Sequence, residues 1–389
     1  MDTDLLVTIV AAAAAIVIVS QHWNEHEFEA YYGDGGRALY PQLLLNACKD
    51  FFKEVTRMER ATFDALISEL QKHGLLEDGR LVMVEEQLLI FLDIVFHNNS
   101  MWQTAVKFRR GLYTINRYFG QVLEALFSLY PLYVRFNPIT CSLPPSILDN
   151  PKYAPFKNCL GALDGVFVPA QVPLNMQSNY RSQKGIIAQN IMAAVNFNFE
   201  FVFVFAGWEG SAHDTRVFNN ATSKGLNIPG NKYFLADAGY GLQKGLMMPY
   251  RAVRYHLKEQ AAAGLRPETK KELYNLCHAT QRNCVKRIFG CIKKKFSILQ
   301  AAPEIELNKQ VRLIYALCML WNFMRKHESV GTIFQDYSEQ DHLNFQSSNS
   351  DDNEPPPTTA QQDEYMKFRR DQLADKFWDQ YQSYLRHRQ

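Results

Sequence analysis

The chain has 389 residues, more than one compact domain usually contains, so we expect two folded units with tails. Hydrophobic residues make up 47% of the sequence and charged residues 21%, which excludes a wholly disordered protein. Lys and Arg number 42 against 40 Asp and Glu, giving a net charge of only +2. Any nucleic-acid-binding surface must therefore be local.

The cysteines predict a reducing compartment. There are seven, an odd number, and none are spaced as CxxC, which argues against a disulfide framework and against a zinc knuckle. Three of them, Cys277, Cys284 and Cys291, recur every seven residues. On a helix this spacing is about 10 Å per step, too long for one shared metal ion and typical of a buried stripe.

Residues 1–50 contain an apolar run, Leu5–Val19, of 15 residues. A helix needs about 20 residues to span a bilayer. Asp2 and Asp4 precede the run, where a secretory signal would carry Lys or Arg. We therefore expect an apolar segment and linker, with a membrane anchor as the alternative.

Between residues 51 and 135 apolar residues recur at spacings of three and four, which predicts helices. Two short helices, VEEQLLIFLDIVFH and NNSMWQTAVKFRR, precede a longer one, GLYTINRYFGQVLEALFSLY. This order is typical of a helix-turn-helix, whose last helix would offer Thr114, Asn116 and Arg117 to a DNA major groove. An ordinary helical bundle has the same periodicity and is the alternative.

A proline-rich connection ends near Asp149 and precedes a region, 150–330, that is rich in strands. Segments with Val, Phe, Ile and Tyr predict strands, and the second and third suggest a hairpin turning at Asn198 and Phe199. The strand segments are NCLGALDGVFVPAQV, IMAAVNFN, FEFVFVFAGW and KYFLADAGY, and two long helical patterns follow them. This order predicts an α/β or α+β domain.

Two different segments close the chain. Residues 338–362 are rich in Ser, Asp, Asn, Gln and Pro, a composition that predicts a disordered linker. Residues 363–389 predict a charged helix. We expect this helix to be solvated on most faces, with the docking of a protein partner as the alternative.

Three aspartates lie where a predicted strand meets a turn: Asp164, Asp214 and Asp237. Carboxylates gathered at the edge of a sheet repel one another unless a divalent cation neutralises them, so the cluster predicts Mg²⁺ or Mn²⁺ with oxygen ligands. Two such ions can promote phosphoryl transfer. The alternative is that each aspartate caps a turn.

The motifs around these aspartates occur in an order that resembles the Harbinger/PIF transposase family of DDE-type nucleases. GALDGVFV contains Asp164, GWEGSAHDTRVF contains Asp214, and YFLADAGYGL contains Asp237. The following MMPYRAVRYHL and LCHATQRNCVKRIFGCIKKKFSIL are similar to the family's closing segments, so the resemblance runs from about Phe156 to Met324. The upstream VEEQLLIFLDIVFH and TINRYF resemble its N-terminal DNA-binding half, which favours the helix-turn-helix interpretation.

The resemblance implies an α/β fold with an RNase H-like mixed sheet flanked by helices, preceded by an all-helical, helix-turn-helix-like region. It implies catalysis by Asp164 and Asp237 and binding of a divalent metal by these two residues and Asp214. It also implies DNA as the substrate, with a protein partner on the helical region or the C-terminal helix. The implied location is the nucleus, with the cytoplasm as a second location.

One position departs from the family pattern. Where the family has RN-x-x-E-R-x-F-G, with the final glutamate of its triad, this chain reads RNCVKRIFG and carries Lys286. A protonated ammonium cannot bind a metal ion and would compete with one. The expected function is therefore metal-dependent DNA cleavage that is impaired, with a catalytically inactive DNA-binding or partner-binding protein as the alternative.

The charge around Lys286 is strongly positive. Residues 265–300 carry nine Lys or Arg and two Glu, a local net charge of +7. We expect Arg282, Arg287 and Lys293 to contact DNA phosphates. A solvated basic face is the alternative.

Overall fold

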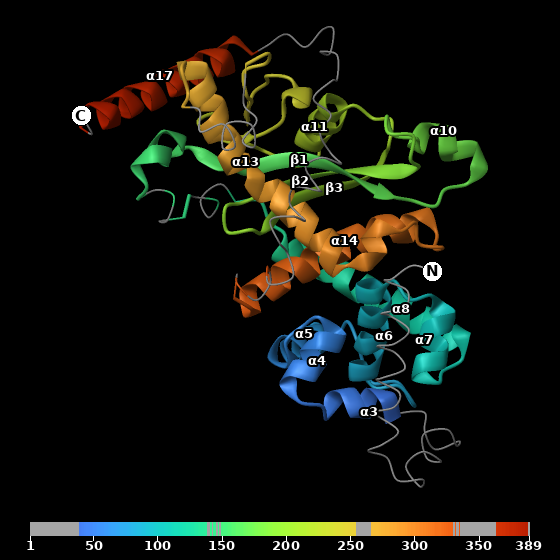
Figure 1. The fold of residues 1–389 in the computed structure, drawn as a ribbon. Helices are drawn as coiled ribbons and strands as arrows, with labels where there is room; N and C mark the ends of the chain where they lie inside the picture. Colours follow the sequence, from blue (N-terminus) through green and yellow to red (C-terminus); the bar gives the residue numbers. More distant parts are fainter. Residues whose placement is uncertain are drawn as a thin grey trace, which may run out of the picture. The chain divides into compact units, whose positions relative to one another are not determined.

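The computed structural model describes residues 39–137, 141, 143–144, 147, 149–253, 266–329, 331, 334 and 363–387 (Figure 1). The chain divides into two compact units. The chain passes from the first unit to the second within residues 94–123. The apolar run Leu5–Val19 and the predicted linker 338–362 lie outside the described residues. Within the described ranges, no helix is both long enough and apolar enough to cross a membrane.

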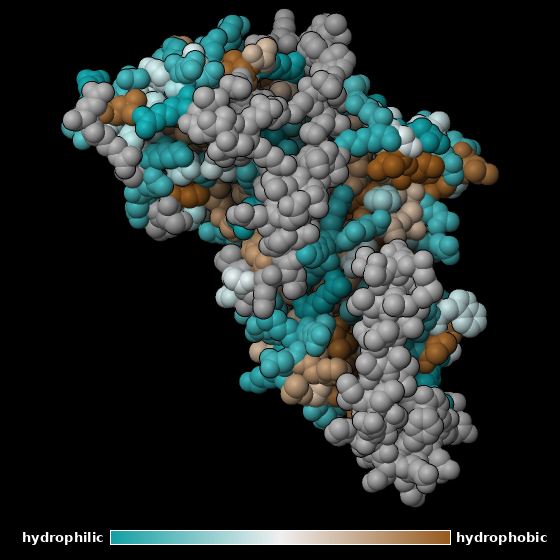
Figure 2. All heavy atoms as spheres, viewed as in Figure 1, coloured by the Kyte–Doolittle hydropathy of each residue, from teal (hydrophilic) through white to brown (hydrophobic). Residues whose placement is uncertain are grey.

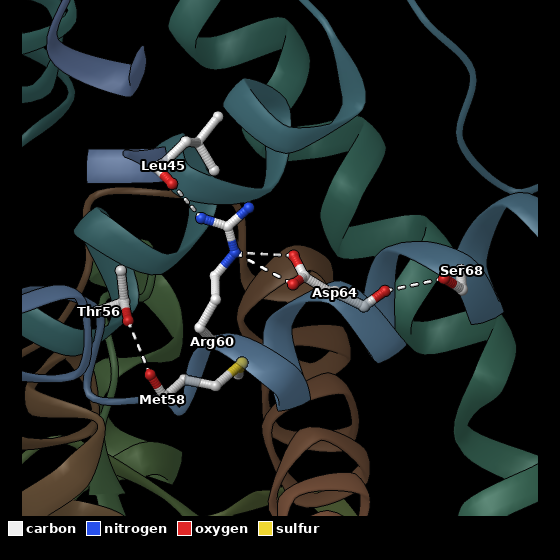
Figure 3. A network of polar contacts seen from close by, with 6 residues as sticks. All are labelled: Leu45, Thr56, Met58, Arg60, Asp64 and Ser68. Atoms are coloured by element: carbon white, nitrogen blue, oxygen red, sulfur yellow. Dashed lines mark hydrogen bonds and ion pairs between the residues drawn. The ribbon is translucent and has the colours of Figure 1, made fainter. Parts of the chain in front are cut away.

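The first unit is helical. Arg60 connects three of its helices, because its Nε donates to both carboxylate oxygens of Asp64, at 2.9 and 3.1 Å (Figure 3). Its guanidinium also donates to the carbonyl of Leu45 and lies over the ring of Phe52. The helices are α3 (Leu39–Leu45), α4 (Lys49–Thr56), α5 (Arg60–Lys72), α6 (Val84–His97), α7 (Met101–Phe108) and α8 (Leu112–Tyr133), of which α6 and α8 continue into the second unit.

Two ion pairs, one of them buried on both sides, hold α6 to the segment that contains α7. Glu86 on α6 pairs with Arg110 at 2.7 Å, and both side chains are almost fully buried. Asp93, one turn before the end of α6, pairs with Lys107 of α7. Three residues, ending in Gly111, then connect α7 to α8. A short helix, a three-residue turn with glycine and a longer helix are the elements expected of a helix-turn-helix.

The second unit contains a five-stranded sheet with the order β3-β2-β1-β4-β5. Neighbours β1, β2 and β3 are antiparallel, whereas β4 is parallel to β1 and β5 is parallel to β4. The strands are β1 (Cys159–Pro169), β2 (Ala188–Val195), β3 (Phe201–Glu209), β4 (Tyr233–Leu235) and β5 (Leu246–Met247). This mixed sheet with flanking helices is the α/β, RNase H-like architecture predicted above.

Helices cover this sheet. Figure 1 shows α13 crossing the strands, and it packs on β1 while α14 packs on β3. The 3-10 helix η4 (Ala238–Tyr240) replaces the end of the predicted strand KYFLADAGY, which stops at Leu235. The helices of this unit are α10 (Gln177–Tyr180), α11 (Asp214–Ser223), α13 (Lys270–Lys295), α14 (Leu307–His327) and α17 (Glu364–Arg386).

The C-terminal helix α17 packs on other elements of its unit through one face. It was expected to be solvated on most faces, and the structure adds that one face packs on α13 and on the segment η2 (Pro151–Phe156). Phe377 contacts Phe156 with ring centroids 4.8 Å apart, and Asp371 accepts a hydrogen bond of 2.6 Å from the hydroxyl of Tyr250. Four residues of α17 are buried, Met366, Leu373, Ala374 and Phe377, whereas Tyr365, Phe368 and Tyr384 are exposed.

Gly161 is required where β1 meets two strands. Its φ of +147° is one that side chains rarely adopt, and an added Cβ would lie 1.9 Å from the carbonyl oxygen of Val195. The pairing of β1 with β4 is irregular between Cys159 and Gly161. Glycine therefore permits the close approach of β2 on one side of β1 while β4 pairs on the other.

The surface is mixed in polarity. Figure 2 shows mainly hydrophilic residues, with apolar residues gathered in the region of α10. The exposed apolar side chains of the neighbouring segments include Leu174 and Ile186. Six of the seven cysteines are buried, Cys277, Cys284 and Cys291 among them, and each of the seven is a free thiol in the described structure.

Candidate active site

Asp164 and Asp237 follow equivalent positions of two neighbouring strands. In the parallel pair β1 and β4, Ala162 lies opposite Leu235, and each aspartate comes two residues later. Parallel strands place equivalent positions at the same end of the sheet, so the two carboxyl groups are brought together. Asp164 was expected at the end of a strand, but it lies inside β1, opposite Ala193 of β2, and its Oδ1 accepts from Gly165 N at 3.0 Å. Asp237 follows β4 and caps η4, where its Oδ1 accepts from Ala238 N at 2.8 Å.

Arg282 of α13 lies between these two carboxylates. Its Nη1 is 2.9 Å from Oδ2 of Asp237 and 3.7 Å from Oδ2 of Asp164. The Arg282 side chain is only 8% exposed. We predicted Arg282 as a DNA-phosphate contact, and the structure instead gives its guanidinium two internal carboxylate partners.

The charges at this site act differently on the two carboxyl groups. Burial by itself raises the pKa of Asp237, but the cations of Arg282 and Lys286 outweigh it and lower that pKa to about 2. For Asp164, burial is the larger effect and raises the pKa above its usual value, although the same two cations oppose it. Lys286 thus acts electrostatically on both acids, together with Arg282, which lies one turn earlier on α13 and contacts both carboxylates.

Asp214 belongs to a second group of oxygen atoms beside Asp164. It begins α11, and its Oδ1 lies 3.3 Å from the position that a Cβ on Gly165 would occupy. The hydroxyl of Tyr240 lies 3.3 Å from that position, and the amide oxygen of Asn190 lies 3.4 Å from it. The absence of a side chain at Gly165 therefore leaves room for three oxygen atoms next to the Asp164 backbone.

Tyr240 is fully buried, and its hydroxyl has no hydrogen-bond partner among the described residues. Burial first, and then the carboxylates of Asp214, Asp164 and Asp237, raise the pKa of Tyr240 well above its usual value. The hydroxyl therefore keeps its proton and remains a donor. The sequence analysis missed this residue, although it lies three positions after Asp237 in the same motif.

The donor atoms of the acidic pair suit a divalent cation only in part. Carboxylate oxygens are ligands that Mg²⁺ and Mn²⁺ prefer. Across the described ranges, however, no group of three or more His, Cys, Asp and Glu side chains could hold a metal ion. The guanidinium of Arg282 also lies where it competes for the same oxygens. These residues do not fit a complete two-metal centre.

The other predicted DNA contacts lie in separate places. On α8, Asn116 and Arg117 are exposed, whereas Thr114 is half-buried, and Asn116 donates to the carbonyl of Leu112 at 3.0 Å. On α13, the Arg287 guanidinium lies over the rings of Phe199 and Phe334, and Lys293 donates to a carbonyl of β1. A contact of any of these residues with DNA stays a prediction.

Comparison with known proteins gives the site a context. Residues 163–322 match the model of the DDE superfamily endonuclease, and residues 38–128 match a domain of unknown function (DUF8040). Protein ALP1-like from Arabidopsis thaliana is 23% identical over 244 residues, which cover 58% of this chain and 55% of that protein. The match therefore spans little more than half the length of this relative. No solved structure matches significantly. The matched segment includes β1, β4 and the long helix that carries Arg282, so this chain carries a DDE superfamily endonuclease domain over residues 163–322.

Proposed function

We propose that the chain is a Harbinger-type transposase-derived protein that acts on DNA and whose metal-dependent phosphodiester cleavage is impaired. The observation that carries this proposal is the positive charge of Lys286 beside the acidic pair, which acts on both Asp164 and Asp237 and, with Arg282, lowers the pKa of Asp237. The family match supports DNA as the substrate class.

The impairment has a simple electrostatic origin. Arginine at position 282 agrees with the family motif, so the changed residue is Lys286, where the family has glutamate. This difference removes one oxygen ligand and alters the local charge by two units. A divalent cation must then compete with two positive side chains for two carboxylates, which weakens its binding. When bound, a divalent cation would supply electrostatic stabilisation of the transferring phosphoryl group.

The test compares the parent protein with Lys286→Glu, because this variant restores the ligand. We expect Lys286→Glu to bind Mn²⁺ more tightly in titration calorimetry and to nick supercoiled plasmid faster in Mn²⁺. Adding Asp164→Asn should abolish the gained nicking. Lys376→Glu is the matched control, since Lys376 is an exposed lysine of α17 and its reversal should change neither property. Equal metal binding and nicking by the parent and Lys286→Glu would contradict the proposed impairment.

A second candidate function is a catalytically inactive DNA-binding or partner-binding protein that retains the fold. The same contacts of Arg282 with both carboxylates favour it, because an internal cation satisfies the acidic pair without a metal ion. Failure of Lys286→Glu to bind Mn²⁺ or to nick DNA would favour this candidate.

The helical unit is the proposed site of duplex recognition. Tyr113, Asn116 and Arg117 are exposed on the first turns of α8, which follows a short helix and a three-residue turn. Loss of Arg117 should weaken binding to duplex DNA and reduce the slope of log K against log salt by about 1 if it contacts one phosphate. Lys49→Ala, at an exposed position of α4, is the control. Nuclear localisation follows from this function and can be checked with a fluorescent fusion.

A further inference from the structure

The segment after the last strand of the sheet, residues 247–253 (MMPYRAV), has no role in the function proposed above. It begins at the edge where the acidic pair lies. Strands β4 and β5 are parallel, and Leu235 lies opposite Met247. Asp237 and Pro249 each come two residues later, so the two chain segments leave the sheet at the same end.

The backbone of this segment is fixed to α13. The amide of Tyr250 donates to Oδ1 of Asn275 at 2.8 Å, and the carbonyl of Tyr250 accepts from Nδ2 of Asn275 at 2.9 Å. Asn275 is fully buried, and Arg282 lies about two turns later on the same helix. Arg251, the residue after Tyr250, is therefore held against the helix that carries the counter-ion of the acidic pair.

The backbone turns sharply just after Arg251. Ala252 has a φ of +55°, in the left-handed region that residues with a side chain rarely adopt. Such a conformation costs free energy and persists only where the surrounding structure holds it, often beside a functional group. The turn at Ala252 thus fixes the direction in which the backbone presents Arg251.

The Arg251 guanidinium is hydrogen-bonded to the turn that carries Asp237. Its Nη2 donates to the carbonyl oxygen of Ala238 at 2.5 Å, and the amide of Ala238 donates to Oδ1 of Asp237 at 2.8 Å. One residue thus connects the two side chains, through its carbonyl on one side and its amide on the other. With standard backbone bond lengths, the guanidinium nitrogen and the carboxylate oxygen are at most about 10 Å apart.

Arg251 differs from Arg282 in its access to solvent. Arg282 is only 8% exposed and lies between two carboxylates, whereas Arg251 is exposed. A guanidinium carries five N–H donors in a planar fork that matches the oxygens of a phosphate. The carbonyl of Ala238 accepts from one nitrogen and orients the fork, and solvent exposure allows a ligand to reach the group.

We propose that Arg251 binds a backbone phosphate of the DNA strand that reaches the acidic pair. This inference rests on the DNA-directed function proposed above. A phosphate beside Asp164 and Asp237 is repelled by their charges, and a cation held next to Asp237 offsets that repulsion. A strand of duplex DNA rises about 3.4 Å per nucleotide, so the bound phosphate lies within roughly three nucleotides of the bond at the acidic pair.

The experiment measures duplex DNA binding at a series of salt concentrations for the parent, Arg251→Met, Arg251→Gln and Arg251→Lys. Loss of one phosphate contact should reduce the slope of log K against log salt by about 0.9 in the Met and Gln variants. Arg251→Lys retains the charge but not the planar fork, so it should keep the parent slope and bind with lower affinity.

Arg181→Met is the matched control. Arg181 is also an exposed arginine of the second unit, and its Nη1 donates to one backbone carbonyl, that of Gly185, at 2.8 Å. It forms a β-bridge with Ile187, next to the β2 residue that lies opposite Pro169 of β1. Pro169 is about 17 Å along the strand from Asp164, so this control should retain the parent slope.

A merely structural role for Arg251 predicts a different result. If the guanidinium only holds the Ala238 carbonyl, Arg251→Met lowers the midpoint of urea unfolding and keeps the parent slope, which overturns the inference. An equal loss of slope in Arg251→Met and Arg181→Met indicates a diffuse basic surface and also overturns it. If Arg251→Met does not fold, Arg251→Gln decides by its slope, because its amide can still donate to Ala238.

The outcomes also separate this inference from the function on which it rests. A parent that binds DNA with the same slope as Arg251→Met and Arg251→Gln overturns the phosphate contact alone. Absence of DNA binding by the parent overturns both proposals.

Discussion

Nη1 of Arg282 lies 2.9 Å from Oδ2 of Asp237, and this contact joins the long helix α13 to the turn that follows β4. The same nitrogen lies 3.7 Å from Oδ2 of Asp164. One side chain thus neutralises two acids on neighbouring strands. It serves as an internal counter-ion for the pair.

Replacing this counter-ion should destabilise the fold. In Arg282→Met, Asp164 and Asp237 remain as two largely buried like charges, and the expected loss is about 3 kcal/mol of unfolding free energy at pH 7. Millimolar Mn²⁺ should restore part of that loss, since the cation replaces the guanidinium. Urea denaturation with and without Mn²⁺ measures both effects. Lys270→Met removes the exposed ion pair with Asp375 and should have little effect. An equal loss in both variants would contradict the role of Arg282.

His278 should make stability depend on pH. Burial first, and then the charge of Arg282, lower the pKa of His278 to about 3, while its Nε2 is 2.9 Å from the carbonyl oxygen of Met247. In the unfolded chain His278 binds a proton below about pH 6.5, but in the native state it does not. Stability contributed by the neutral ring is therefore complete above pH 6.5 and is lost as the pH falls toward 3, by roughly 1.4 kcal/mol per pH unit.

His278→Gln tests this dependence, because glutamine retains an amide donor for Met247 and does not titrate. The difference in unfolding free energy between the parent and His278→Gln should change in favour of the variant as the pH is lowered from 7 to 4. Other acidic groups affect both proteins alike and cancel in this difference. A constant difference across that range would show that His278 is not held neutral.

Gly161 should be among the least replaceable residues of the second unit. An alanine Cβ at this position would lie 1.9 Å from the Val195 carbonyl oxygen, so β1 and β2 would have to separate. We expect Gly161→Ala to cost about 3 kcal/mol or more, through overpacking and an unfavourable φ. Gly120→Ala is the matched control: nothing lies within 4 Å of its added Cβ in α8, and it should gain about 1 kcal/mol in helix propensity. Thermal melting of both variants gives the comparison.

The hydroxyl of Tyr240 should contribute little to stability. Tyr240 and Tyr274 are both fully buried, but only Tyr274 donates a hydrogen bond, to the carbonyl of Met248 at 3.1 Å. Tyr274→Phe leaves that carbonyl without its donor and should cost about 1–3 kcal/mol. Tyr240→Phe removes a hydroxyl that has no hydrogen-bond partner in the described part of the chain, and it should change the free energy of unfolding by less than about 0.5 kcal/mol. A similar cost in both would mean that an ordered water binds the Tyr240 hydroxyl.

The sequence by itself determined the features that depend on local pattern. Helical periodicity identified α5 to α8, and runs of Val, Phe and Ile identified the strands β1 to β3. This was possible because the residues that form one strand or one helix face lie close together in the sequence. The motifs that contain the three aspartates and the lysine at position 286 were readable for the same reason, although Asp164 proved to lie inside β1 and not at its end. Short elements such as β5 carry too few residues for a pattern and were not predicted.

Only the tertiary structure decided which distant residues meet. Parallel pairing of β1 with β4 brings Asp164 to Asp237, and α13 then inserts Arg282, although these residues are separated by 45 positions or more in the chain. The sequence analysis assigned Arg282 to DNA because a basic residue looks the same whether its partner is a phosphate or a buried carboxylate. Burial and long-range packing make that distinction, as they do for α17, where packing on α13 and η2 decides which apolar residues are buried, such as Phe377, and which stay exposed, such as Phe368.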